Sequence, residues 1–122
     1  MRGVSPGPAR SHDLAREAAH LTLTKRAEDV VILDLSGVEA VCDYFVVATG
    51  NSEVQVKAIA DAVEEGIAKH GRKPWHVEGY GARRWILLDY VDFVVHVFHT
   101  RAREYYLLER LWGDVRREVI SD

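Results

Sequence analysis

Residues 43–52 read DYFVVATGNS, an almost continuously apolar run that ends in a glycine and two small polar residues. A run of this kind is typical of a central strand covered on both faces of a sheet. Ser52, with Gln55 three residues later, forms a capping box, which predicts that a helix begins directly after the strand. Gly71 is a suitable end for that helix. The apolar residues between these limits recur at helical spacing and form one stripe: Val56, Ile59, Ala60, Val63 and Ile67.

Further elements are predicted on both sides of this strand and helix. Helical spacing favours a helix from Ser11 to about Arg26, with Ser11 as its N-cap. Apolar and β-branched runs predict strands at residues 30–33, 75–78, 85–89 and 93–98, and a last helix is predicted at 103–112. The last two strands are expected to form a hairpin around Tyr90 and Val91, although neither residue favours positive φ.

The predicted fold class is α/β: a mixed β-sheet of about five strands with flanking helices. A length of 122 residues suits one domain. We place that domain at residues 11–114, after a flexible Gly/Pro-rich leader at residues 1–10 and before a C-terminal tail at residues 115–122.

Composition and charge restrict the function. No apolar run approaches the roughly 20 residues of a membrane span, and a single cysteine, Cys42, favours a reducing cytoplasm. Residues 28–71 hold nine acidic and two basic side chains, a balance of 2 − 9 = −7. The chain lacks the clustered basic field that nucleic-acid binding requires. The acidic middle suits a basic protein partner, and the alternative is a solvated helix face.

Residues that often carry chemistry do not converge. His96 and His99 lie three apart on a predicted strand and face opposite sides, so they cannot share an ion. The lone Cys42 is more consistent with a buried thiol than with a nucleophile. We therefore expect no metal, no cofactor and no catalytic site. Carboxylates at strand ends are able to hold magnesium but more commonly cap turns: Asp43, Asp89 and Asp92.

One candidate binding surface follows from the alternation of side chains along the strand at residues 85–89. Trp85 is of the residue type that most often anchors protein interfaces. The alternative is that Trp85 belongs to the core and that Asp89 caps the hairpin turn. The predicted partner-binding residues share one sheet face or the adjoining face of the last helix: Trp85, Leu87, Asp89, His96, Tyr106 and Glu109.

An ordered set of residues resembles the ribosomal silencing factor family (RsfS, or Iojap-like) over about residues 13–114. The first half of the set is the run 43–52 with the helical stripe after it. The second half consists of short matches in a fixed order: Glu78-Gly79, Trp85, Asp89, Asp92, Val94–Val97, Arg103, Tyr106, Leu108-Glu109 and Leu111-Trp112. Members of that family often have glycine between Asp89 and Asp92, where this chain has Val91.

The resemblance implies a mixed sheet fold related to nucleotidyltransferases, homodimerisation, and binding to the large ribosomal subunit through its fourteenth ribosomal protein. Such binding blocks joining of the small subunit and represses translation when nutrients are short. Organelle members assist assembly of the large subunit. The rival function is an active nucleotidyltransferase, but this chain has no Asp-x-Asp pair to hold two metal ions.

Overall fold

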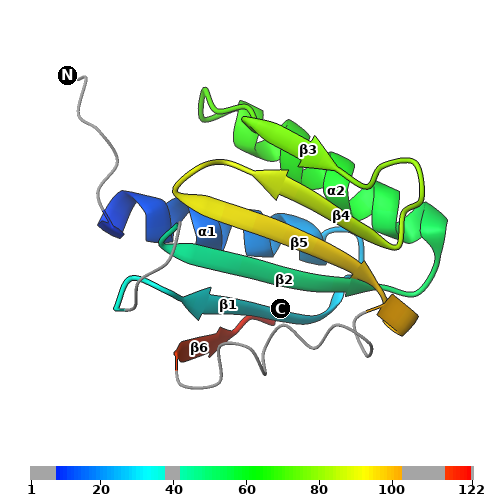
Figure 1. Cartoon of the computed structure of the whole chain (residues 1–122), viewed down its shortest axis with the longest axis horizontal. Coiled ribbons are helices and arrows are strands. Elements are labelled where there is room, and N and C mark those ends of the chain that lie inside the picture. Colours follow the sequence, from blue (N-terminus) through cyan, green and yellow to red (C-terminus); the bar gives the residue numbers. More distant parts are fainter. Residues whose placement is uncertain (1–7, 38–41, 103–114, 122) are drawn as a thin grey trace.

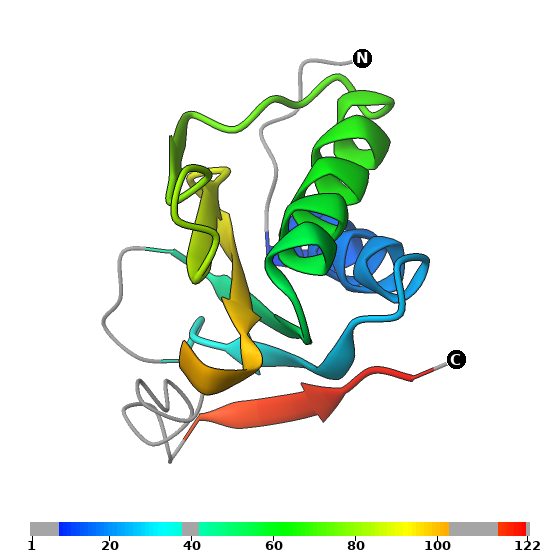
Figure 2. The ribbon, with the colours of Figure 1, turned by 90° about the vertical axis from the view of Figure 1, so that its right-hand side faces the viewer.

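The computed structural model describes residues 8–37, 42–102 and 115–121. Six strands form one sheet in the order β3-β4-β5-β2-β1-β6, and both helices lie on the same face of that sheet (Figure 1 and Figure 2). Neither of these helices is long and apolar enough to cross a membrane. The elements in chain order are α1 (Pro8–Leu23), β1 (Glu28–Asp34), β2 (Tyr44–Gly50), α2 (Glu53–Ala68), β3 (His76–Glu78), β4 (Trp85–Asp89), β5 (Phe93–His99) and β6 (Arg116–Val119).

The predicted mixed α/β fold is confirmed, with β2 at its centre. This strand pairs in parallel with β5 and antiparallel with β1. Val46 and Ala48 pack into the core under the helices, whereas Val47 belongs to a second apolar cluster on the opposite face. Because both faces are covered by apolar side chains, the uninterrupted apolar run is explained.

The predicted start of α2 is also confirmed, with one difference in its hydrogen bonds. The Gln55 backbone N–H donates to Ser52 Oγ at 3.0 Å. The Gln55 side-chain carbonyl accepts from the backbone N–H of Asn51, at 2.6 Å, and not from that of Ser52. Gly66 lies inside the helix where a Cβ would stand 2.3 Å from the Leu21 side chain of α1. The absence of a side chain at residue 66 therefore permits α1 and α2 to pack closely.

Two predictions at the ends of the chain are wrong. Helix α1 begins at Pro8 and not at Ser11, because proline is tolerated in a first helical turn, where its missing N–H has no partner to lose. Ser11 lies inside the helix, is fully buried, and donates to Asp92 Oδ2 at 2.8 Å.

Residues 115–122, which we set apart as a tail, contain a sixth strand. β6 pairs antiparallel with β1, and Glu118 in it makes a hydrogen-bond contact with His12 and an ion pair with Arg16 of α1. The strand is short, charged and at a sheet edge, so its sequence lacks the apolar alternation that announces a strand. The helix predicted at residues 103–112 lies outside the described residues.

Candidate functional site

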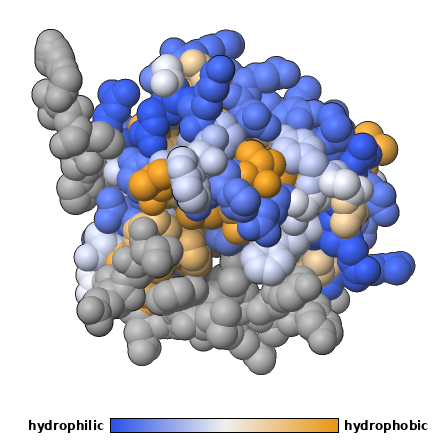
Figure 3. Space-filling view, turned by 45° about the horizontal axis from the view of Figure 1, so that its top comes forward, coloured by the Kyte–Doolittle hydropathy of each residue, from blue (hydrophilic) through white to orange (hydrophobic). Residues whose placement is uncertain are grey.

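The sheet has a second apolar cluster on the face that α1 and α2 do not cover (Figure 2). Its fully buried members come from the central strands and include Leu33, Val47 and Phe98. Trp85 and Leu87 are only partly buried and pack against it. On the side of the molecule seen in Figure 3, the surface is mostly hydrophilic and hydrophobic residues reach it in separate patches.

The alternation predicted for the strand at residues 85–89 is confirmed. Ile86 and Leu88 are fully buried in the core under the helices, whereas Trp85, Leu87 and Asp89 are half-buried on the other face. His96 is the register partner of Leu87 on β5. The structure therefore brings four of the six predicted residues together. The other two, Tyr106 and Glu109, lie outside the described residues.

Trp85 is held by an aromatic group on this face. Its indole Nε1–H donates to His96 Nδ1 at 3.0 Å. The indole also stacks on Phe98, with ring centroids 5.0 Å apart. Phe45 meets the His96 ring edge-on at a centroid distance of 4.5 Å. These contacts fix the orientation of the largest side chain on the face.

His96 is a supporting residue rather than an exposed one, since only 4% of it is accessible to solvent. An indole N–H can only donate, so Nδ1 must be the unprotonated nitrogen and the neutral ring carries its proton on Nε2. Nε2 is buried and has no hydrogen-bond partner within residues 8–37, 42–102 and 115–121. Burial lowers the pKa of His96 to about 4, so the ring is neutral at physiological pH.

The predicted hairpin between β4 and β5 is confirmed, and its turn is strained. Val91 has φ +78°, in the left-handed region that a β-branched residue rarely adopts. Asp89 Oδ1 accepts from the Val91 backbone N–H at 2.8 Å. Asp89 thus caps the turn while it lies on the same face as Trp85, so the capping role and the position on the candidate surface occur together.

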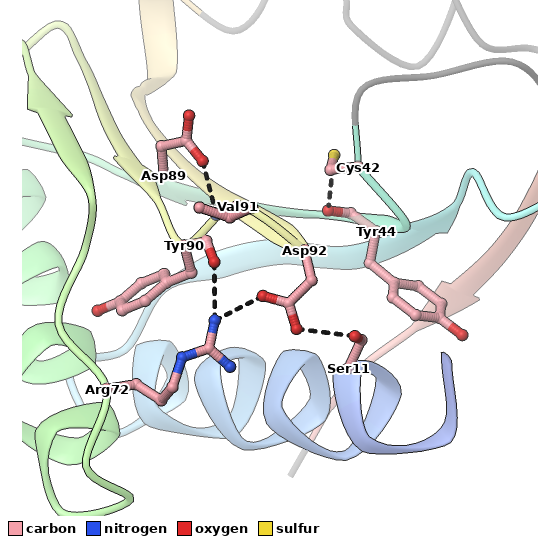
Figure 4. Close-up of polar contacts among 8 residues, drawn as sticks. All are labelled: Ser11, Cys42, Tyr44, Arg72, Asp89, Tyr90, Val91 and Asp92. Carbon is pink, nitrogen blue, oxygen red and sulfur yellow. Dashed lines mark hydrogen bonds and ion pairs between the residues drawn. The ribbon is translucent and has the colours of Figure 1, made fainter. Parts of the chain in front are cut away.

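Asp92 has a different, structural role (Figure 4). Its carboxylate accepts from Ser11 of α1 at 2.8 Å and from Arg72, which lies between α2 and β3, at 2.6 Å. Burial opposes its charge, but these two bonds, the positive charge of Arg72 and a backbone hydrogen bond together outweigh burial and hold the pKa of Asp92 below its usual range. Asp89 and the Cys42 sulfur lie on the other side of the turn (Figure 4).

The structure gathers no metal ligands in the part of the chain that it describes. There, no three side chains of His, Cys, Asp or Glu come close enough to hold an ion. His96 and His99 both lie on β5 and, three residues apart, face opposite sides of the sheet. The buried Cys42 thiol has a pKa raised to about 11, mainly by burial, which is unlike a reactive cysteine.

Several residues of this face were missed from the sequence. Phe45, Val94 and Phe98 have the same alternation along β2 and β5 that identified Trp85, so their positions in the strands were a usable signal. Trp75, which is 76% exposed, is predicted as the first residue of a strand but lies just before the short strand β3, so alternation along that strand does not place it.

Comparisons with known proteins agree with the resemblance seen in the sequence. Residues 8–122 match the family described as "Ribosomal silencing factor during starvation" (RsfS). The Bacillus subtilis (strain 168) protein named "Ribosomal silencing factor RsfS" is 48% identical over 90 residues, which span 74% of this chain and 76% of that protein. The Mus musculus protein named "Mitochondrial assembly of ribosomal large subunit protein 1" is 27% identical over 117 residues, which span 89% of this chain and 50% of that protein.

A solved structure supports the same assignment. The X-ray crystal structure of a protein from Chromobacterium violaceum is similar with a TM-score of 0.81 and 31% identity, covering 91% of this chain and 92% of that chain. The family match extends over both helices and all six strands. The chain therefore belongs to the family of ribosomal silencing factors, RsfS.

Proposed function

We propose that this protein binds the large ribosomal subunit through its fourteenth ribosomal protein, prevents the small subunit from joining, and so represses translation when nutrients are limiting. The support is membership of a family described as silencing the ribosome during starvation, and the name of the mouse relative, which refers to the large subunit. The sequence lacks the clustered basic field that nucleic-acid binding requires, which favours a protein as the direct contact.

The contact is made by a docking face, which we define as Trp85, Leu87 and Asp89. One observation carries this assignment: the Trp85 indole is fixed by His96 on a sheet face that neither helix covers. A side chain that is already fixed loses little conformational entropy on binding. A half-buried tryptophan among apolar neighbours also has the properties of an interface anchor. Tyr106 and Glu109 remain proposed contacts that flank this face.

The residues of the docking face have separate roles. Trp85 and Leu87 supply apolar area, and the Asp89 carboxylate pairs with lysine or arginine of the ribosomal protein. Loss of one partner of a desolvated charge pair costs about 2–5 kcal/mol, whereas an exposed rim charge contributes under about 1 kcal/mol. A binding titration can therefore distinguish the loss of a desolvated charge pair from the loss of an exposed rim charge.

The experiment measures affinity for purified large and small subunits by sedimentation, together with thermal stability. We expect the wild-type protein to sediment with the large subunit only, and Trp85→Ala and Leu87→Glu to lose about 30-fold or more in affinity. Asp89→Lys is compared with Glu65→Lys, a reversal of an exposed charge on α2 at the opposite side of the sheet. Normal binding by Leu87→Glu and Asp89→Lys, with a stable fold, would exclude this face.

Two other functions can be tested separately. The name of the mouse relative favours a role in assembly of the large subunit, which predicts that deletion leaves incomplete large subunits even in rich medium. An active nucleotidyltransferase would bind magnesium nucleotides, and calorimetry is expected to detect no such binding.

We also expect a homodimer, which light scattering would reveal as a mass about twice the 13.8 kDa of the chain.

A further inference from the structure

A hollow of about 300 Å³ lies beside the tip of the β4–β5 hairpin. It is lined by Cys42, Trp75, Asp89, Val91 and Val94, of which only Asp89 is charged. Four large hydrophobic side chains of the described residues are strongly exposed, and two of them, Trp75 at 76% and Val91 at 60%, line this hollow. Exposed apolar groups therefore gather around one concave site.

The turn beside this hollow has a residue type that its backbone conformation disfavours. Glycine adopts positive φ without strain, yet residue 91, at φ +78°, is a valine. Its side chain is exposed, so burial of Val91 within this chain does not offset the strain. An observed outlier of this kind is a reason to consider a function. We take the side chain of Val91 to serve a contact outside this chain.

The hollow continues the docking face. Asp89 belongs to both, and Val94 lies opposite it in the β4–β5 register. Cys42 and Val94 are members of the same apolar cluster against which Trp85 and Leu87 pack. A partner that covers Trp85 and Leu87 would therefore reach the hollow without leaving this face of the sheet.

The charges around the hollow are negative. The carboxylates of Asp43, Asp89 and Asp92 are close enough to the Cys42 thiol to favour its protonated form. Asp92 is neutralised by Arg72 on the far side of the turn. Asp43 and Asp89 remain, and among the described residues no lysine or arginine lines the hollow. A group that enters the hollow therefore binds more strongly if a positive charge of the same partner lies next to it.

We propose that this hollow binds one apolar side chain of a basic segment of the protein partner, with Asp89 and Asp43 pairing with the lysine or arginine beside it. This inference rests on the proposed function, since the partner is the one that covers the docking face. The volume lies at the lower limit of binding pockets, about 300 Å³, which suits a single protruding side chain rather than a drug-sized ligand.

The test compares binding to purified large ribosomal subunits with stability. Trp75→Ala is expected to lower affinity about 30-fold, as for an interface anchor. Val91→Gly is expected to lower affinity about 10-fold while its thermal midpoint stays equal to or rises above that of the wild type, because the strain is relieved. Val54→Ala is the matched control, since Val54 is 74% exposed at the start of α2. Its affinity should change less than about twofold.

A second pair of measurements addresses the charge. Asp89→Asn keeps an oxygen that can accept from the Val91 N–H but removes the negative charge. We expect this variant to bind more weakly than the wild type. When the salt concentration of the assay is raised from about 50 to about 200 mM, its affinity should fall less than that of the wild type. Asp13→Asn, an exposed change on α1, should leave the salt dependence unaltered.

The outcomes separate the two proposals. If Leu87→Glu loses binding while Trp75→Ala and Val91→Gly bind as the wild type does, the hollow is not part of the interface and this inference is overturned alone. If the two variants change self-association in light scattering and not subunit binding, the occupant is a second copy and the proposal is equally wrong. A wild-type protein that does not bind the large subunit overturns the proposed function and, with it, this inference.

Discussion

Acidification should destabilise the fold through His96 in particular. In the native protein the ring is buried, and its Nδ1 faces the Trp85 N–H, a donor. A proton on Nδ1 would break that bond and bury a charge, and burial holds the pKa of His96 at about 4. In the unfolded chain the ring is hydrated and takes up a proton with a pKa of about 6.5.

The sign and size of the effect follow from this difference. Because the native pKa is the lower one, only the unfolded chain binds the proton between the two values. The stability that neutral His96 contributes is complete above about pH 6.5 and is lost as the pH falls toward about 4. A difference of about 2.5 units at about 1.4 kcal/mol per unit gives about 3 kcal/mol in the free energy of unfolding.

The assay is denaturant unfolding from pH 7.5 to 4, on the wild type and on His96→Asn. The asparagine does not titrate, and its Oδ1 replaces Nδ1 as the acceptor for the indole N–H. Five other histidines and all carboxylates titrate in both proteins, so they cancel in the difference. We expect the difference in free energy of unfolding between the two proteins to be constant above pH 7. By pH 4 it should have changed by about 3 kcal/mol in favour of the variant. If the free energies of unfolding of the two proteins stay parallel from pH 7.5 to 4, the conclusion that His96 is buried and neutral in the native protein is refuted.

Two further predictions concern packing and charge. Gly66→Ala should destabilise the wild type by about 1 kcal/mol despite the better helix propensity of alanine, because the new Cβ meets Leu21 at 2.3 Å. In a Leu21→Ala background the same change should stabilise by up to about 1 kcal/mol, and equal effects in both backgrounds would contradict the clash. Asp92→Asn should cost about 1–3 kcal/mol at pH 7, since the negative charge that pairs with Arg72 is lost and one of the two acceptor oxygens is replaced by an NH₂ group. That cost should shrink as the pH falls through the lowered pKa of Asp92, whereas exposed Asp13→Asn should show neither effect.

The parts of the fold that sequence predicted well are those in which one local signal outweighs the others. The apolar run at 43–52 and the Ser52–Gln55 cap identified β2 and the start of α2 because burial and capping act on neighbouring residues. β6 was missed because its stability comes from pairing with β1 and from Glu118, whose partners lie on α1. The sequence predicts Ser11 as a cap because its actual partner, Asp92, is 81 residues away and leaves no local signal.

The candidate site divides in the same way. Alternation along one strand was enough to place Trp85, Leu87 and Asp89 on one face. The hairpin placed His96 next to them, but not beneath Trp85 as its hydrogen-bond acceptor, which depends on the rotamers of both rings. The exposed Trp75 and the strained Val91 come together only in three dimensions, because a loop conformation positions them.

The parallel pairing of β2 with β5 has a consequence for how the chain reaches its native state. During synthesis β2 leaves the ribosome well before β5, and α2, β3 and β4 must all be made before its second neighbour exists. Until then this largely apolar strand has one open edge, the condition under which chains pair with one another. Long-range pairing of this kind also slows folding. A chain stalled between residues 50 and 93 should therefore be a better substrate for chaperones, and more prone to aggregate, than one stalled after β5.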